Sequence, residues 1–469
     1  MNLSNPGVIK PCFTLLLCLT LVFAIWNQPA QAAGYSCPAS NSWVTNPNPP
    51  EEVPLGKDAQ FCQFYQFSWQ WFLQLMSPAP GSNQLRNFEV AQNYPVLEID
   101  ENGNPLNSCD EKISGREFFI RTVKLAGAGG KFTIPRRTGQ AGGGATIYDQ
   151  NGNVVFFDIR FGKNLCNIGS VQSQANYPPG TTELKTAWRI ISEAEKRRYY
   201  WIEADVDGVP GKELLGMIGL HLVRSTALHP EFIWATFEHK DNDPDCTKPG
   251  TDTGWSFTSP MCATNPGQCT FNQATPDTSL KSKPTEICRV YPYGTDPGDN
   301  KAQENLTSIT ELNEQLVGPD GFLTRLNDNN PMAVFRNYFI VGALWENLIT
   351  QPSSNIGNQR GSLRLANTVA ETTFQDVNLN SQFVSNCFGC HHYEVTSRNT
   401  GPSASLSHIF DDIIAGVCTS PTDVEAGPIW NNSDAQTKCP ATCASKGGWN
   451  GQWTTTIPGE MSVCGCCGG

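Results

Sequence analysis

The chain has 469 residues, with 39% hydrophobic and 16% charged side chains. This length exceeds what one hydrophobic core normally organises, so we expect two or more domains. The formal net charge of −12 at pH 7 disfavours nucleic acid and anionic membrane surfaces as partners, and the many glycine and proline residues indicate a loop-rich globular protein, not a disordered one.

The N-terminus has the pattern of a secretory signal peptide. Lys10 precedes an apolar run over residues 13–25, and the small residues Ala30, Ala32 and Ala33 form a cleavage pattern. We therefore expect residues 1–32 to be removed and the mature protein to be periplasmic or extracellular, with an uncleaved anchor as the alternative. No later apolar stretch of the sequence is long enough to span a bilayer.

An oxidising destination explains the high cysteine content. Of the eighteen cysteines, Cys12 and Cys18 lie in the signal peptide, and Cys387 and Cys390 belong to a separate motif. The fourteen that remain are an even number and could form up to seven disulfide bonds.

Residues 61–76 have apolar and aromatic side chains at helical spacing, with Gln and Ser between them, and Pro78 ends the run. We expect a helix here. Packing into a core is the simple explanation, and an aromatic wall beside a planar cofactor is the alternative.

β-Hairpins are expected over residues 95–240, because turn residues at 100–103 and 150–153 separate β-rich runs. Residues 203–208 have the acidic spacing of a calcium loop, but Leu214 stands where the bidentate Glu belongs, which favours an ordinary turn. Residues 240–300 are expected to form a surface insertion without chemistry of its own, held by Cys246, Cys262, Cys269 and Cys288.

From Leu306 to Leu348 the pattern becomes helical, and residues 335–345 are apolar enough for a helix buried on most sides. A second helical stretch is expected to lead through Leu363, Leu365, Val369 and Phe374 toward residue 387.

Residues 387–391, Cys-Phe-Gly-Cys-His, form the C-x-x-C-H signature of covalent haem attachment. Two thiols three positions apart can bond the two vinyl groups of one porphyrin, and the following imidazole supplies the proximal iron ligand. The motif predicts one haem c held by Cys387, Cys390 and His391. A disulfide or zinc pair is the alternative, but zinc needs two further ligands, and His392 alone does not supply them.

The sixth iron ligand is left open by the sequence, because no Met lies between His391 and Met461. We favour His221, which lies in an apolar segment, and His408, which is close to the motif; the other candidates are His229, His239, Met217 and Met332. A His ligand would lower the iron potential relative to Met, and an open position would permit small ligands or peroxide chemistry. The expected aromatic neighbours of the motif are Tyr338, Trp345 and Phe374.

The composition changes near residue 425 and predicts a small separate module. Ser433 can cap a helix over residues 434–445, and alternating runs at 449–456 and 460–466 flank a turn as a hairpin. Two cysteines lie on one helix face and two on one strand face, which predicts two disulfides between helix and sheet, made by Cys439, Cys443, Cys464 and Cys466.

Four blocks of this module occur in the order found in the mannan-binding lectin family first seen in cyanobacteria: A-G-P-I-W from Ala426, D-A-Q from Asp434, G-Q-W from Gly451 and M-S-V from Met461. The module resembles that family over residues 424–467, which implies binding of mannose-containing glycans. The family's lectins carry two such repeats and this chain carries one, so a single site would bind modestly without oligomerisation.

Aromatic rings stack on the apolar faces of sugars, and Asn and Gln amides match paired hydroxyls. The expected glycan-binding residues are therefore Trp430, Asn431, Asn432, Asn450, Gly451, Gln452 and Trp453. The competing explanation is that the tryptophans form the core of the module, and we expect this of one of the two.

The large domain resembles a bacterial cytochrome-c-type family through residues 219–221, residues 237–239 and the C-x-x-C-H site. This resemblance implies a haem but no particular activity.

The fold expected is α+β. A large disulfide-containing mixed domain with β-hairpins and a helical haem-bearing region occupies residues 33–415, a linker spans 416–424, and a lectin module of a helix on antiparallel strands spans 425–469. The function expected is a secreted haem protein that transfers electrons to or from a redox partner protein and binds mannose-containing glycans. The alternatives are a haem oxidase or peroxidase tethered to a glycan, and a lectin with a structural or sensing haem domain.

Overall fold

The computed structural model describes most of the chain between Ser36 and Cys467. The described residues are 36–56, 59–82, 85–90, 93–94, 124–126, 131–133, 146–162, 179–205, 211–248, 254–275, 280–347, 357–376, 386–391, 421–430, 432–443, 446, 449–457 and 459–467. The predicted signal peptide therefore lies outside the described residues, as does His408.

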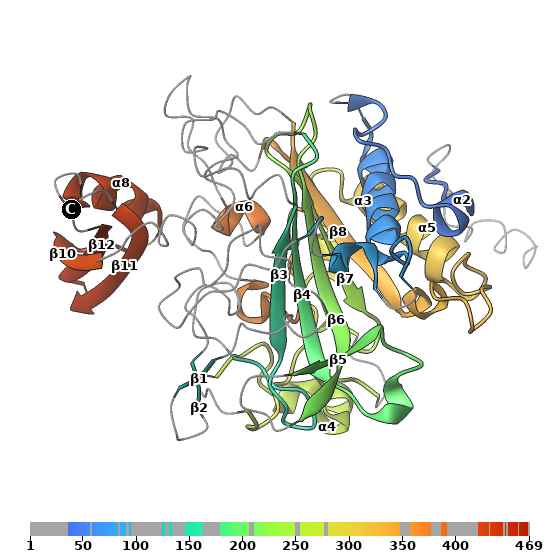
Figure 1. The fold of residues 1–469 in the computed structure, drawn as a ribbon, viewed down its shortest axis with the longest axis horizontal. Coiled ribbons are helices and arrows are strands. Elements are labelled where there is room, and N and C mark those ends of the chain that lie inside the picture. The colour runs from blue at the N-terminus through green and yellow to red at the C-terminus, as the bar shows by residue number, and fades with distance from the viewer. Residues whose placement is uncertain are drawn as a thin grey trace, which may run out of the picture. The chain divides into compact units, whose positions relative to one another are not determined.

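A seven-stranded antiparallel sheet organises the large domain (Figure 1). Its strands follow the order β3-β4-β6-β7-β8-β9, and β5 pairs with β6. The strands are β3 (Phe156–Phe161), β4 (Thr182–Ile190), β5 (Trp201–Asp205), β6 (Lys212–Arg224), β7 (Ile233–His239), β8 (Tyr338–Glu346) and β9 (Gln359–Gly361). Every residue of β7 is buried, which means that the sheet is covered on both faces.

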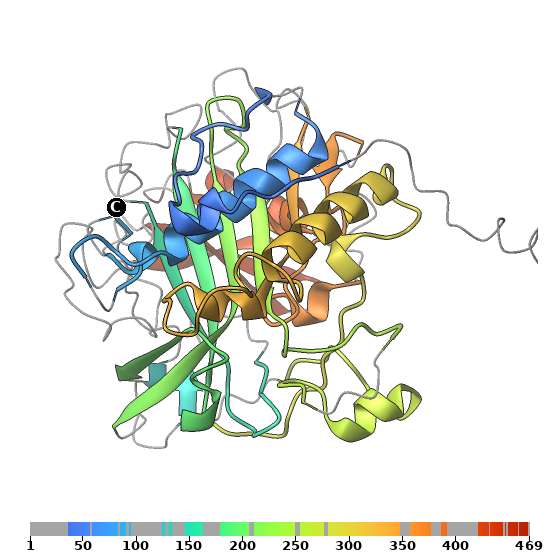
Figure 2. The same ribbon diagram turned by 90° about the vertical axis from the view of Figure 1, so that its right-hand side faces the viewer.

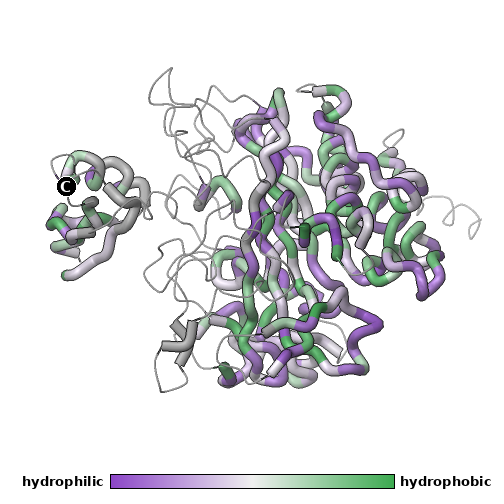
Figure 3. Tube along the Cα trace, in the orientation of Figure 1, coloured by the Kyte–Doolittle hydropathy of each residue, from purple (hydrophilic) through white to green (hydrophobic). Residues whose placement is uncertain are grey.

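Two helices of sixteen residues each, α3 (Phe61–Met76) and α5 (Ala302–Val317), lie side by side on one face of the sheet (Figure 2). Phe72 of α3 stacks on Phe237 of β7 with ring centroids 4.2 Å apart, and Phe64 stacks on Trp345 of β8 at 3.8 Å. The aromatic run at 61–76 is thus a core helix. Hydrophobic residues are distributed along α3 and the strands it covers (Figure 3).

The opposite face is covered by irregular segments from two distant parts of the chain. Phe257 and Ile287 are fully buried in a cluster with Val155, Ile218 and Val369. The expected surface insertion at 240–300 does carry disulfides, Cys246–Cys288 and Cys262–Cys269. It is nevertheless part of the core, because its apolar side chains close the sheet on this face.

Two helices expected from the sequence, at 335–345 and around 363–374, are not formed in the described residues. Residues 338–346 form strand β8, paired on both sides with β7 and β9, and helix α5 ends at Val317. Residues 359–374 contain β9 and one short 3-10 turn, η10 (Thr372–Phe374). A short apolar run has no period that separates a buried strand from a buried helix, and here sheet pairing decides the outcome.

The expected hairpins are present in the described part of residues 95–240. Strands β5 and β6 pair antiparallel up to Asp205 and Lys212, so the calcium-like stretch belongs to a hairpin connection and not to a helix-loop-helix unit. Its residues 206–210 are outside the described residues.

The C-terminal region forms a three-stranded antiparallel sheet of order β10-β12-β11 with one helix. Its elements are β10 (Pro421–Gly427), α8 (Asn432–Cys443), β11 (Trp449–Ile457) and β12 (Met461–Cys467). The hairpin strands lie within one residue of their expected ranges. The helix begins and ends two residues earlier than the expected 434–445, so Ser433 lies inside it and is not its N-cap. Strand β10 was not expected, and it begins inside the range assigned to a linker.

Short elements complete the described chain: α2 (Ser42–Thr45), α4 (Pro260–Thr264), α6 (Cys387–Cys390), β1 (Lys124–Ala126), β2 (Lys131–Thr133), η2 (Asn87–Glu89), η6 (Glu193–Glu195), η7 (Pro266–Gln268), η8 (Pro292–Gly294) and η9 (Ala333–Asn337). A disulfide from Cys37 to Cys62 joins the lead-in to α3. None of the described helices combines the length and apolarity of a bilayer-crossing segment. The architecture is mixed α+β with several disulfides.

Candidate functional sites

The C-x-x-C-H motif forms a single helical turn, α6, with His391 as its C-cap. The Asn386 side-chain oxygen accepts a hydrogen bond from the Gly389 backbone N–H at 3.1 Å, which caps the turn. Asn386 Nδ2 also donates to Gln359 Oε1 at 2.7 Å and to the Leu363 carbonyl at 3.0 Å. One buried amide therefore both starts the turn and ties it to β9.

Trp234 of β7 is the aromatic residue against which this turn packs. Its ring centroid lies 4.8 Å from that of His391 and 6.0 Å from that of the fully buried Phe388. The expected neighbours lie elsewhere: Trp345 stacks on α3, and Tyr338 donates a hydrogen bond to the Met217 carbonyl at 2.8 Å. For Phe374, the described contacts give no ring contact with the turn.

His221 is the distal-ligand candidate that shares a sheet face with α6. It pairs with Thr236 across β6 and β7, and Trp234 points to the same face because it is two residues from Thr236. His221 Nε2 lies 3.0 Å from Glu371 Oε1. Burial alone would raise the pKa of Glu371, but His221 beside it holds the pKa below its ordinary value.

His229 and His239 lie on the α3 side of the sheet. His229 Nδ1 is 2.8 Å from Glu231 Oε1, and the imidazole packs edge-on against Phe64. It helps to line a cavity of about 280 Å³ together with Phe61, Lys301, Trp345 and Arg360. This position separates His229 from the C-x-x-C-H turn.

Both ring nitrogens of His239 are engaged. Nε2 donates to the Arg198 carbonyl at 2.9 Å, and Nδ1 accepts from the Asp241 N–H at 3.1 Å. Burial lowers the pKa of His239 to about 3, so the imidazole is neutral. Met217 and Met332 are also buried, and Met332 Sδ faces the Arg86 guanidinium at 4.0 Å. These contacts make the three residues structural.

The motif's residues fit a covalently held haem in their spacing and donor types. Cys387 and Cys390 are three positions apart on one turn, and the half-buried His391 follows directly. Within the described part of the chain, no three His, Cys, Asp or Glu side chains gather closely enough to hold a bare metal ion.

Two of the three tryptophans of the C-terminal region, Trp430 and Trp453, have described side chains, and their environments differ. Trp430 follows β10, and 65% of its side chain is exposed. Its backbone N–H donates to Asp434 Oδ2 at 3.1 Å, and its indole lies beside the turn at Gly459. Trp453 instead packs on the core formed by residues such as Ile429 and Ala435. Of the two described tryptophan side chains, Trp430 is the one open to a ligand.

Strand β11 carries a bulge opposite β12. Trp449 pairs with Cys466 and Trp453 pairs with Cys464, so four steps along β11 span two steps along β12. Asn450, Gly451 and Gln452 stand opposite the single residue Gly465, so β11 has two surplus residues here. A bulge of this kind re-aims side chains at functional sites. The side chains of Asn432, Asn450 and Gln452, and the whole of Asn431, lie outside the described residues.

Two disulfide bonds join the helix of this small fold to its sheet. Cys439–Cys464 and Cys443–Cys466 each join α8 to β12, and all four cysteines are fully buried. Because a core of this size buries little apolar area, the bridges stabilise the packing of the helix on the sheet.

Comparison with known proteins identifies this region. A family model described as mannan-binding protein (MVL) matches residues 432–466. Residues 432–466 are an MVL-type lectin module. A curated relative, lectin MVL from Microcystis viridis, is 47% identical over 49 residues, which are 10% of this chain and 43% of the relative. The chain thus matches less than half the length of that lectin, and no solved structure matches.

These matches lend no support to a cytochrome c domain in the large sheet region. In the MVL module, two features were missed from the sequence: strand β10 and the half-exposed Ile457 at the end of β11. The alternation over residues 421–427 was a signal for β10 that the assignment to a linker overlooked.

Proposed function

We propose that the MVL module binds mannose-containing glycans and thereby localises the protein on them. The observation that carries this proposal is the exposed indole of Trp430, two residues before the stretch that matches mannan-binding protein. An exposed indole stacks on the apolar face of a pyranose ring, and the amides of the β11 bulge can pair with vicinal hydroxyls. The relative from Microcystis viridis is named a lectin, which supports a carbohydrate ligand.

Calorimetric titration of the full chain with yeast mannan, next to a glycan array, tests this proposal. Trp430→Ala should weaken binding at least tenfold while leaving the unfolding midpoint unchanged, because the indole is mostly in solvent. Ile457→Ala is the matched control, an exposed apolar residue of the same module. No binding by the natural chain, or equal binding by Trp430→Ala, would refute the proposal.

We further infer that residues 387–391 hold one haem c, with His391 as the proximal ligand. The observation that favours it is the capped turn, which presents two cysteines and an imidazole in the required order. Such a haem would supply one-electron transfer with a partner protein. Asn386 positions the turn on β9, and Trp234 sets the face on which His391 lies.

His221 is the proposed sixth ligand among the described residues, and it would have to leave Glu371 to serve. An oxidase or peroxidase is the competing function, and it needs an open iron position. A lectin with a structural or sensing haem domain is the third alternative.

A pyridine haemochrome spectrum of protein exported with the haem-attachment machinery tests the cofactor. The natural chain should give a covalent haem spectrum, and the Cys387→Ala, Cys390→Ala double variant should not. Unchanged spectra on adding carbon monoxide would favour electron transfer over peroxide chemistry. Absence of haem from the natural chain would refute the cofactor and leave the glycan proposal untouched.

Export underlies both proposals, since haem c attachment and disulfide formation take place outside the cytoplasm. N-terminal sequencing of the mature protein should begin near residue 33. A chain that retains its first residues would contradict cleavage.

A further inference from the structure

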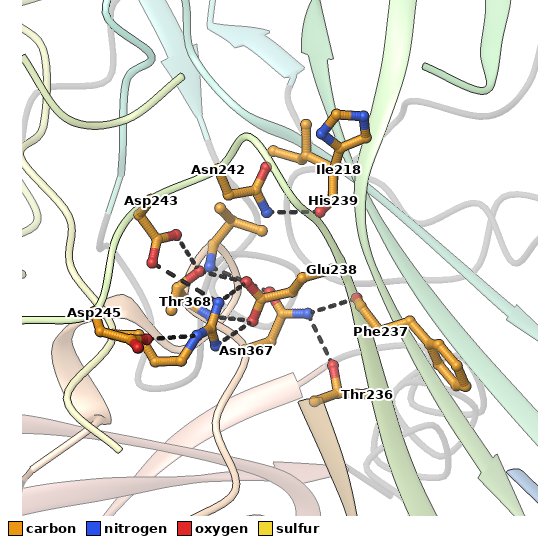
Figure 4. Close-up of polar contacts among 12 residues, drawn as sticks. Ile218, Thr236, Phe237, Glu238, His239, Asn242, Asp243, Asp245, Asn367 and Thr368 are labelled. Atoms are coloured by element: carbon orange, nitrogen blue, oxygen red, sulfur yellow. Dashed lines mark hydrogen bonds and ion pairs between the residues drawn. The ribbon is translucent and has the colours of Figure 1, made fainter. Parts of the chain in front are cut away.

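A buried ionic network joins three segments that are distant in sequence (Figure 4). Glu238 lies on β7, Asp243 follows that strand, Arg289 belongs to the segment before η8, and Thr368 precedes η10. Neither the lectin module nor the C-x-x-C-H turn contributes to it. The side chains of Glu238 and Asp243 are fully buried, and that of Arg289 is 7% exposed.

Glu238 receives several hydrogen bonds and is therefore the ionised carboxylate of the network. Arg289 donates from Nη2 to Oε2 at 2.6 Å and from Nη1 to Oε1 at 3.2 Å, a bidentate pair. The Thr368 backbone N–H donates to Oε1 at 2.8 Å.

The hydrogens available around Thr368 show where a proton must sit. Thr368 Oγ1 lies 2.7 Å from Glu238 Oε2 and 2.6 Å from Asp243 Oδ2, both hydrogen-bonding distances. A hydroxyl has one hydrogen and can donate to only one of these oxygens. The other short contact needs a hydrogen on the carboxyl group, and Glu238 is ionised. Asp243 therefore donates to Thr368, which donates to Glu238.

The charges around Asp243 agree with this assignment. Arg289 is the cation that faces it, and Glu238 and Asp245 are the neighbouring anions, with Asp245 Oδ1 4.0 Å from Arg289 Nε. Burial raises the pKa of Asp243 to about 7; the attraction of Arg289 opposes this rise, and the charge of Glu238 adds to it. One guanidinium cannot compensate three ionised carboxylates at once.

We propose that Asp243, Thr368 and Glu238 form a pH-sensitive latch that fastens residues 367–372 to β7 and to the loop after it. The latch is closed while Asp243 carries its proton. Once Asp243 ionises, the single Thr368 hydrogen faces two carboxylate oxygens, and one of the two contacts is lost. The fastened segment also holds Asn367 on Thr236 and Glu371 on His221, and it precedes the α6 turn in the chain.

The test is the pH dependence of urea unfolding for the full chain, comparing the natural chain with Asp243→Asn. Between about pH 4 and pH 7 folded Asp243 keeps a proton that it has lost in the unfolded state, so this group should contribute a rise of about tenfold per pH unit to the unfolding constant. The Asn amide donates to Thr368 at every pH, so this component should vanish in the variant. Asp328→Asn, at a side chain 92% exposed, is the control and should keep the natural slope.

Infrared spectroscopy gives a second readout, taken as the difference between the natural chain and Asp243→Asn, because burial also raises the pKa of Asp158 to about 6. At pH 6 this difference should contain the C=O stretch of a protonated carboxyl group, and the band should disappear above pH 8. Thr368→Ser keeps the hydroxyl and should keep the pH slope of unfolding. Thr368→Val removes the hydroxyl that joins Asp243 to Glu238 and should change this slope. Parallel pH curves for Asp243→Asn and the natural chain, or no protonated carboxyl band in this difference at pH 6, would overturn the latch.

Discussion

Arg289→Met should be among the most destabilising single changes in this protein. Met retains much of the apolar stem of Arg289 but removes both donors to Glu238, at 2.6 and 3.2 Å, and the cation opposite Asp243. Glu238, whose side chain is 0% exposed, keeps only the donors of Thr368. Removal of one partner from a buried ion pair costs about 3–5 kcal/mol, because the remaining charge is uncompensated.

Urea unfolding followed by tryptophan fluorescence at pH 7 measures this loss. Adding Glu238→Gln to Arg289→Met removes the orphaned charge, so the double variant should recover about 0.5–3 kcal/mol relative to Arg289→Met. Asp328→Asn breaks an exposed pair with Arg336 and should change stability by less than about 1 kcal/mol. A cost below 1 kcal/mol for Arg289→Met, or no recovery in the double variant, would show that the network is not a buried ion pair.

Further changes test packing and the module. Gly342→Ala should lower the free energy of unfolding in urea by about 1–3 kcal/mol, because a Cβ at this position would clash with Ser362 Oγ. Gly267→Ala is the control and should be nearly neutral, because no atom lies within 4 Å of a Cβ there. Equal effects of the two changes would contradict this packing. Removing the Cys443–Cys466 bridge by a double Ala substitution should destabilise the module by about 2–5 kcal/mol and weaken mannan binding in the same titration, and unchanged thermal unfolding of the module would contradict a stapled fold.

Local patterns were sufficient where the chain repeats a period or carries a motif. The helix at Phe61–Met76 was predictable because its apolar residues recur at helical spacing and Pro78 ends them. The hairpin of the MVL module was predictable from its alternating runs. Its helix has little apolar periodicity and was predicted from the residues that flank it and from the spacing of its cysteines. The C-x-x-C-H signature is itself local, so its five residues were found directly.

Other features depended on contacts between residues distant in sequence. Residues 338–346 became a strand because β7 and β9 offered hydrogen bonds on both edges, which a continuous apolar run does not reveal. In the sequence, Trp430 and Trp453 were equivalent candidates for glycan binding. In the structure Trp453 packs on the core of the module and Trp430 is exposed. Phe257 and Ile287, expected on a surface insertion, fill the covered face of the sheet.

The sequence by itself determined the elements with a clear period, the MVL blocks and the C-x-x-C-H motif, because each depends on residues within one or two turns or one strand. Only the tertiary structure decided which sheet face His221, His229 and His239 occupy and that Trp430 is exposed. It also brought together Glu238, Asp243 and Thr368, the last about 130 positions from the first two. Such a network has no sequence signature. Its protonation depends on burial and on the contact of one hydroxyl with two carboxyl groups, and both conditions are met only when distant segments pack together.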